Sequence, residues 1–240
     1  MCGRYSVGKD PVRVAMENAD DTFYFDLVFN AAPAQSLPVI LLEKDKLVSR
    51  NMFWGFKRKT GELVINGKSE TLKRKFGKFI QSRCLIPANG FYEWEQAAHG
   101  KLPWRFVLKT GKSFCFAGLY CQTLTDDHKQ MDLDITDTPP ASCIKESFLI
   151  ITTNPNSLVQ KVHNRMPVIL EPTHYHWWLD ESKSISSHEI PRAFGQTIST
   201  DTEPFELALQ TFPASKMESY RVSQAVNNSR NNTQECFKPV

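Results

Sequence analysis

Hydrophobic residues recur along the chain in short runs separated by turn-forming residues, a pattern typical of β-strands. Two runs, LPVILLE (37–43) and KLVSRNMFW (46–54), are separated only by Lys44 and Asp45, which predicts a hairpin. Four more runs predict an antiparallel meander, its last two members joined by a short turn at 110–112. They are CLIP (84–87), GFYEWEQ (90–96), PWRFVLK (103–109) and SFCFAGLYC (113–121).

Two later runs, ESFLIITT (146–153) and PVIL (167–170), predict further strands. Three segments predict helices. In the first, 69–80, apolar residues recur at helical spacing after Ser69, a candidate cap; the second begins with Asn154 as its cap, and the third begins at Pro172. His174 and His176 lie on the third helix and are expected at the surface.

The remaining segments are expected to be irregular. Residues 126–142 are polar and end in prolines, which favours a loop. The asparagine-rich segment 227–240 is expected to form an extended C-terminal tail on a core of 1–226. We therefore predict a single α+β domain over 1–240, in which mainly antiparallel strands form a barrel-like curved sheet with a few flanking helices.

Composition narrows the class of protein. The chain is 41% hydrophobic with a net charge of +3, which is typical of a globular protein and requires any polyanion to be met by a local patch. It has no apolar run of about 18 residues and no signal sequence, so we expect a cytoplasmic protein, nucleoid-associated in a bacterium. Its six cysteines form no CxxC pair, which indicates neither a zinc site nor a disulfide framework. We expect no cofactor, no metal, no membrane contact and a monomer.

The first five residues, MCGRY, carry candidate chemistry. Aminopeptidases remove an initiator methionine when the next residue is small, which would leave Cys2 with a free α-amine beside its thiol. Such a 1,2-aminothiol can attack an aldehyde twice, because nitrogen forms a Schiff base and sulfur then closes a thiazolidine ring. An α-amine is deprotonated far more often than a lysine near neutral pH. The alternative is an incidental Met-Cys start.

Glu93 in GFYEWEQ is a second candidate. Strand alternation places Phe91 and Glu93 on one face and Tyr92 and Trp94 on the other. If the Phe91 face is the inner one, burial would raise the pKa of the Glu93 carboxyl and suit it to general acid/base work. If that face is the outer one, Glu93 is simply solvated, and the pattern alone leaves both readings open.

Two loop segments add further polar candidates. HNRMP (163–167) places His163, which could carry a proton near neutral pH, beside Arg165, which could bind a phosphate. NGKSET (66–71) presents Asn66 and Lys68 where a strand leads into a helix. Each segment could equally be structural, the first as a histidine at a helix end and the second as a turn in which Gly67 supplies an unusual dihedral angle.

Taken together, nine segments in order resemble one family over essentially the whole chain. They are MCGRY, FNAAP (29–33), FWG (53–55), NGKSET, RCLIPANGFYEWE (83–95), FAGLY (116–120), LIITTNPN (149–156), HNRMPVIL (163–170) and YRVSQAVNNSRNN (220–232). This is the SRAP family of SOS-response-associated peptidase-like proteins, which are also described as abasic-site processing proteins.

The resemblance implies a covalent chemistry. In this family the mature N-terminal cysteine forms a thiazolidine crosslink with the ring-opened aldehyde of an abasic site in single-stranded DNA, which shields the lesion during repair. By the same pattern Cys2 is the nucleophile, Asn66 hydrogen-bonds the ring, Glu93 orients and deprotonates the cysteine, and His163 handles the sugar oxygen. An abasic sugar is mostly a closed hemiacetal, so its opening needs an acid and the amine needs a base.

The resemblance also implies DNA contacts. Arg4 and Arg165 would hold phosphates beside the lesion, and Asn30 of FNAAP joins them as a DNA contact. Trp54 could stack on a base or lie in the core. Lys68 stands where the family commonly has an arginine, and FKRKTGELV (56–64) follows where an apolar, proline-containing stretch is common.

Two other functions remain open at this point. Cys2 could be the N-terminal nucleophile of a self-processing thiol peptidase with His163 as its base. The protein could also be a non-covalent single-stranded DNA-binding module in which Cys2 is incidental.

Overall fold

A computed structural model describes residues 2–16, 20–58, 60–98, 100–122, 146–180 and 208–240. One sheet has five strands in the order β17 (Met217–Arg221), β12 (Gly100–Leu108), β11 (Gly90–Ala97), β1 (Tyr5–Val7) and β4 (Val28–Ala31). The second has eight, ordered β15 (Met166–Pro167), β14 (Ser147–Thr153), β6 (Lys46–Trp54), β5 (Ser36–Glu43), β10 (Arg83–Ala88), β13 (Phe114–Cys121) and β16 (Ile169–Leu170), with β9 (Asn66–Lys68) paired to β14.

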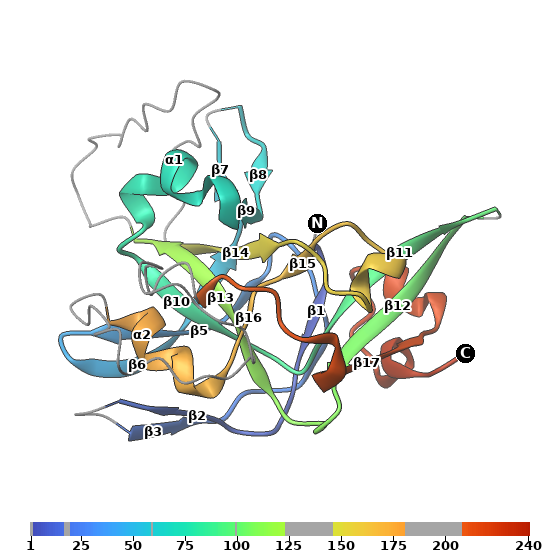
Figure 1. The fold of residues 1–240 in the computed structure, drawn as a ribbon, viewed down its shortest axis with the longest axis horizontal. Coiled ribbons are helices and arrows are strands. Elements are labelled where there is room, and N and C mark those ends of the chain that lie inside the picture. The colour runs from blue at the N-terminus through green and yellow to red at the C-terminus, as the bar shows by residue number, and fades with distance from the viewer. Residues whose placement is uncertain (1, 17–19, 59, 99, 123–145, 181–207) are drawn as a thin grey trace.

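The larger sheet curves until its strands close on themselves. Because β14 pairs with β13 as well as with β6, the strands β14, β6, β5, β10 and β13 form a ring of hydrogen-bonded neighbours. Pairing is antiparallel except where β14 runs parallel to β6 and β9. Two short ribbons, β2 (Val12–Ala15) with β3 (Asp20–Phe23) and β7 (Phe56–Lys57) with β8 (Leu63–Val64), lie outside these sheets (Figure 1). The predicted α+β fold of mainly antiparallel strands in a curved sheet is confirmed.

The β5–β6 hairpin is also confirmed. Lys44 and Asp45 both have positive φ, 47° and 63°, as the tightest hairpin turns require. The predicted four-strand meander is wrong. β10 pairs with β13, whereas β11 pairs with β12 in the other sheet, so the turn at 110–112 joins two sheets. β13 is buried on both faces, so its sequence carried no alternation to indicate its neighbours.

The helices are shorter than the sequence predicts. Segment 69–80 divides into η1 (Ser69–Thr71), α1 (Leu72–Phe76) and η2 (Gly77–Phe79), and Ser69 makes no cap. After Asn154 the chain forms only η3 (Val159–Lys161), and the Asn156 side chain accepts the backbone N–H groups of Leu158 and Val159 at its start.

The third predicted helix does begin at Pro172. It consists of η4 (Pro172–His174) and α2 (Tyr175–Leu179), and α2 packs on β10, where the Trp178 indole donates to the Cys84 carbonyl. His174, expected at the surface, is buried and stacks on Trp177. Tyr175, Trp178 and Leu179 of α2 are buried as well, so more of this short helix faces the core than the sequence indicated.

The C-terminal segment folds back instead of extending. After η5 (Ala214–Lys216) and β17 come η6 (Gln224–Asn227) and η7 (Gln234–Phe237), and Cys236 is buried against Tyr92, Val222 and Val226. The side chain of Asn30 holds this segment by donating to the backbone oxygens of three of its residues, Val226, Asn228 and Asn231. The prediction of an extended tail is therefore wrong.

Two further findings concern the described residues. None of their helices is long and apolar enough to cross a membrane. The loop predicted at 126–142 lies outside the described residues.

Candidate active site at the amino-terminal strand

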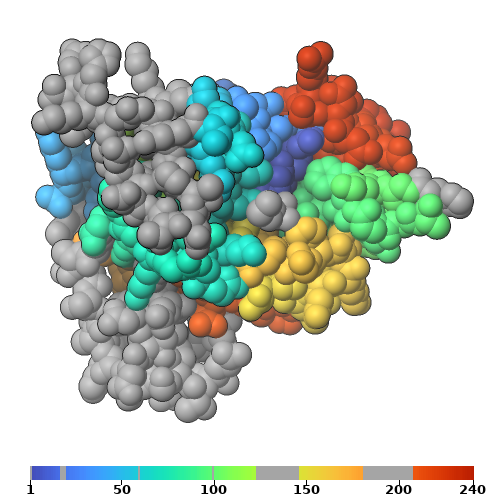
Figure 2. Space-filling view, turned by 90° about the horizontal axis from the view of Figure 1, so that it is seen from above, coloured from blue at the N-terminus to red at the C-terminus, as the bar shows by residue number. Residues whose placement is uncertain are grey.

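The amino-terminal segment enters the molecule beside β11. Tyr5 pairs with Phe91, and the Tyr92 N–H donates to the Arg4 carbonyl at 3.0 Å, which extends the ladder toward the chain end. Cys2 has no exposed surface and packs in the same core cluster as Phe91. Figure 2 shows this dark-blue segment enclosed between the β11–β12 hairpin, in green, and the C-terminal region, in red.

Glu93 lies on the inner face of β11. Its exposure is 3%, and Phe91 on the same face is buried in the core. Tyr92 faces the other way, into the cluster beneath the C-terminal segment. The strand alternation predicted from the sequence is confirmed, and the inner-face reading of Glu93 is the correct one. Burial raises the pKa of the Glu93 carboxyl to about 8, while the positive amino terminus nearby acts in the opposite direction.

His163 faces Glu93 across the site. Its Nε2 is 4.0 Å from Glu93 Oε2. Burial, together with the charge of the amino terminus, lowers the pKa of the His163 imidazole. The Arg165 backbone N–H donates to His163 Nδ1 at 3.1 Å, and the Arg165 carbonyl oxygen is also 3.1 Å from Nδ1. Nδ1 therefore has a partner as an acceptor and as a donor.

The Cys2 thiol is poorly suited to act as a thiolate. Burial, and then the Glu93 charge, raise the thiol pKa far above its ordinary value. Its only recorded hydrogen bond among the described residues is a weak one of 3.9 Å to the Arg4 carbonyl. An attack that begins from an α-amine and uses the thiol second is better matched to these surroundings than one that begins from a thiolate.

Asn66 comes from β9, which runs parallel to β14. Its amide donates to the Ile150 carbonyl at 3.4 Å, and its buried Oδ1 has no hydrogen-bond partner among the described residues. No hydrogen bond joins Asn66 to Cys2, Glu93 or His163 in that part of the chain. The next residue, Gly67, has no unusual dihedral angle; a Cβ there would lie 2.8 Å from a methyl group of the Leu72 side chain, so close packing at this position favours glycine.

Two of the residues expected to contact DNA, Trp54 and Asn30, are buried. Trp54 is fully buried, stacks on Phe148 and donates to the Ile65 carbonyl, so it is a core residue. Asn30 is buried, and its side chain is hydrogen-bonded to the C-terminal segment and to Arg4. Lys68 is exposed at the end of β9.

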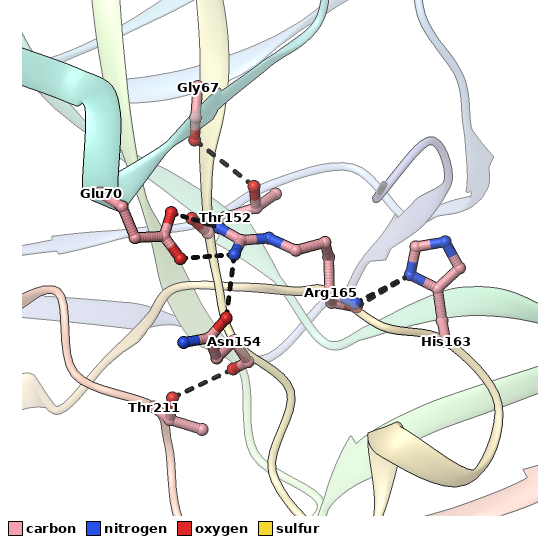
Figure 3. Close-up of polar contacts among 7 residues, drawn as sticks. All are labelled: Gly67, Glu70, Thr152, Asn154, His163, Arg165 and Thr211. Carbon is pink, nitrogen blue, oxygen red and sulfur yellow. Dashed lines mark hydrogen bonds and ion pairs between the residues drawn. The ribbon is translucent and has the colours of Figure 1, made fainter. Parts of the chain in front are cut away.

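Arg4 and Arg165 are both partly enclosed. Arg4 donates to Asn30 at 2.9 Å and to the Val226 carbonyl at 2.6 Å, with its guanidinium over Trp94. Arg165, whose side chain is 11% exposed, forms a two-point ion pair with Glu70 (Figure 3).

Glu70 is a residue that sequence reasoning missed. It also lines a groove of about 470 Å³ whose other walls include basic residues of α1, and the lining residues are Ser69, Glu70, Lys73, Arg74, Thr153, Asn154, Leu209, Gln210 and Thr211. The only signal in the sequence was an acidic residue inside NGKSET, which an ordinary helix start also explains. Within the described residues no group of three or more histidine, cysteine or carboxylate side chains could hold a metal ion.

Comparisons with known proteins identify the family of this chain. The sequence profile of the SOS response associated peptidase (SRAP) family matches residues 1–229, and the chain belongs to this family. It is 31% identical to the abasic site processing protein YoqW of Bacillus subtilis (strain 168), over 99% of each chain. It is 26% identical to the abasic site processing protein HMCES of Xenopus tropicalis, over 100% of this chain and 78% of the relative.

Solved structures share the fold. A protein from Bordetella bronchiseptica superposes with a TM-score of 0.62 at 18% identity, over 92% of this chain and 100% of that one. A protein from Bacteroides thetaiotaomicron gives a TM-score of 0.61 at 21% identity, over 88% and 85%. The resemblance to the SRAP family that the motifs indicated is thereby confirmed.

Proposed function

We propose that this protein recognises abasic sites in single-stranded DNA and joins them covalently to Cys2 after Met1 is removed. The observation that carries the proposal is the buried Glu93 carboxyl, whose charge acts on the Cys2 thiol, whose Oε2 lies 4.0 Å from Nε2 of His163 and whose pKa is about 8. The names of the relatives, abasic site processing proteins, support the same lesion.

The chemistry balances without a cofactor. As the hemiacetal opens to an aldehyde, His163 gives a proton to the sugar ring oxygen, and the anomeric hydroxyl gives up its own proton, which returns to His163 through solvent. The Cys2 amine adds to the aldehyde carbon, and water leaves to form the Schiff base. The thiol sulfur then bonds to the same carbon while its proton passes to nitrogen, which closes the thiazolidine. The sum is one aldehyde plus one aminothiol giving one thiazolidine and one water.

Glu93 is proposed as the base that takes a proton from the amine. An α-ammonium group has an ordinary pKa of about 7.8, so transfer to a carboxylate whose pKa is about 8 is nearly thermoneutral. The buried Oδ1 of Asn66 has no hydrogen-bond partner among the described residues, and Asn66 is proposed to hydrogen-bond the thiazolidine ring. Arg4 and Lys68 are proposed as phosphate contacts, which are blind to base sequence.

The test is incubation with a single strand carrying one abasic site, followed by a denaturing gel and intact-mass analysis. The parent protein should begin at Cys2 and give a stable band. Cys2→Ser keeps the amine but replaces sulfur with a poorer nucleophile, so the stable band should be lost while a borohydride-trapped Schiff base remains. The band should need no added metal.

Each alternative gives its own result. An undiminished band from Cys2→Ser would assign the chemistry to another residue. Full activity with Met1 retained would remove the aminothiol mechanism. Binding with no covalent product would leave a non-covalent DNA-binding module, and cleavage of peptide substrates that depends on Cys2 would indicate a thiol peptidase.

A further inference from the structure

The Arg165 side chain is held on three sides (Figure 3). Its two terminal nitrogens meet the Glu70 carboxylate at 2.5 and 2.9 Å, one of them also donates to Asn154 Oδ1 at 3.1 Å, and the other donates to the Thr152 carbonyl at 2.7 Å. A two-point arginine–carboxylate pair fixes direction as well as distance. The side chain has little freedom left to meet a DNA phosphate.

The backbone of the same residue holds the His163 ring. The N–H and carbonyl oxygen of Arg165 both lie 3.1 Å from Nδ1. In the neutral ring with its proton on Nε2, Nδ1 accepts from the N–H; in the protonated ring, Nδ1–H donates to the carbonyl. A proton carrier needs such a partner in both states, and the Arg165 backbone supplies it only while this turn keeps its position.

We propose that Glu70 is a positioning residue for His163, acting through Arg165. Glu70 fixes the guanidinium, the guanidinium fixes the Arg165 backbone, and that backbone orients the imidazole so that Nε2 points toward Glu93. Glu70 itself touches neither Cys2 nor Glu93 among the described residues. Among the described residues, Glu93 from β11 and the Arg165 backbone face the ring, and the charge of the amino terminus lowers the pKa of the imidazole.

The first measurement is an NMR titration of His163, which needs no DNA. Glu70→Gln keeps the size of the side chain but removes its charge. Loss of the carboxylate, an unpaired Arg165 and a looser Nδ1 contact all disfavour the protonated ring, so the His163 pKa should fall and its nitrogen shifts should indicate mixed tautomers. Glu70→Asp, which keeps the charge, should restore the parental signals in part.

The second measurement rests on the proposed function and is a double-mutant cycle on crosslink formation. At saturating abasic DNA and neutral pH, Glu70→Gln should slow formation about 10-fold, which is less than the roughly 10²-fold cost of a 1 Å misplacement because the ring keeps its other contacts. In a His163→Ala background the same change should have almost no effect, because there is no ring left to position. Affinity for undamaged single strands should stay within about two-fold.

A control lies on the β2–β3 ribbon, far from the site in Figure 1. Asp20 there accepts from Nε and one terminal nitrogen of Arg13, which is also a two-point pair, whereas Glu70 meets both terminal nitrogens of Arg165. Asp20→Asn should leave both the titration and the crosslinking rate unchanged. If Glu70→Gln fails to fold, Asn154→Ala removes one contact of the same guanidinium and should show the same effects in milder form.

Three results would overturn the proposal. An unchanged His163 titration in Glu70→Gln would mean that Glu70 does not position the ring. If Glu70→Gln slows crosslink formation equally in the parent and in the His163→Ala background, Glu70 acts on the reaction without His163. Several-fold tighter binding of undamaged DNA by Glu70→Gln would mean that Glu70 competes with phosphate for Arg165. If the parent protein forms no crosslink, the proposed function fails, and the titration still decides the role of Glu70.

Discussion

Burial raises the pKa of the Glu93 carboxyl, and the same burial lowers the stability of the folded protein at alkaline pH. The carboxyl is 3% exposed with a pKa of about 8, against an ordinary 4.5. The folded state therefore holds a proton that the unfolded chain releases, so stability is greatest at acidic pH and falls as pH rises from about 4.5 through 8. Gln is neutral at every pH and nearly the same size.

Glu93→Gln should accordingly raise stability at alkaline pH. We expect a gain of roughly 2–4 kcal/mol at pH 9 and almost none at pH 5, because the parental carboxyl is neutral at the lower pH. Denaturant unfolding at the two pH values measures the difference. Glu95→Gln, on the more exposed half of the same strand, is the control and should change little. An equal gain at both pH values would mean that packing, not ionisation, is responsible.

The role of His163 predicts a kinetic signature. Its lowered pKa and the Glu93 pKa of about 8 should bound a rate maximum near neutral pH, with a decline on the alkaline side as the ring loses its proton. His163→Ala should slow crosslink formation by about 10²-fold and remove that alkaline decline. Release into excess competitor should slow as well, by microscopic reversibility.

Paired time courses for formation and release measure this. The contrary result is a variant that forms and releases crosslinks at parental rates but binds undamaged DNA poorly. His163 would then be a structural or phosphate contact.

At the scale of elements, what could be predicted depended on local chemistry. The β5–β6 hairpin followed from Lys44 and Asp45, and the inner position of Glu93 followed from alternation along β11. The partners of β13 could not be predicted, because a strand buried on both faces has no alternation of polar and apolar residues to indicate which strands lie beside it. Trp54 was open to either reading, since a tryptophan at a strand end suits a core and a base-stacking surface equally.

The C-terminal segment was missed for a related reason. Its asparagines resemble those of an irregular tail, yet they make long-range contacts, as when Asn232 accepts the backbone N–H of Phe29 at 2.7 Å. Asn30 contributes most, because one amide group donates to three carbonyl oxygens of the segment. Arg4 is held by the same amide, which ties the segment to the amino-terminal strand.

Asn30→Ala should therefore loosen the C-terminal segment. We expect a loss of about 2–4 kcal/mol, because the hydrogen bonds that the Asn30 amide makes to the segment and to Arg4 are lost together. Amide hydrogen exchange should quicken from Gln224 to Phe237 more than in the β5–β6 hairpin. Asn51→Ala, at an exposed position on β6, is the matched control. Uniformly faster exchange across all the described strands would instead indicate a general loss of stability.

At the scale of the whole molecule, the charge is too small to attract DNA by itself. There are 29 lysines and arginines against 26 carboxylates, so binding must come from a few local contacts. Arg165 is neutralised by Glu70, which leaves Arg4, Lys68 and the basic residues of α1 as candidates. With about two or three phosphate contacts, affinity for undamaged single strands should fall about 7- to 20-fold between 50 and 200 mM salt.

The crosslinking step should respond differently to salt. Once the strand is bound and saturating, mobile ions should screen the reacting groups poorly, because Cys2 and Glu93 are buried and the His163 side chain is only 26% exposed. The maximal rate should therefore change by less than about two-fold over the same salt range, while the DNA concentration needed for half-maximal rate rises with the dissociation constant. Single-turnover kinetics at several salt concentrations separate the two quantities. A maximal rate that falls in parallel with affinity would mean that the reacting groups are assembled by surface charge and not by the buried geometry.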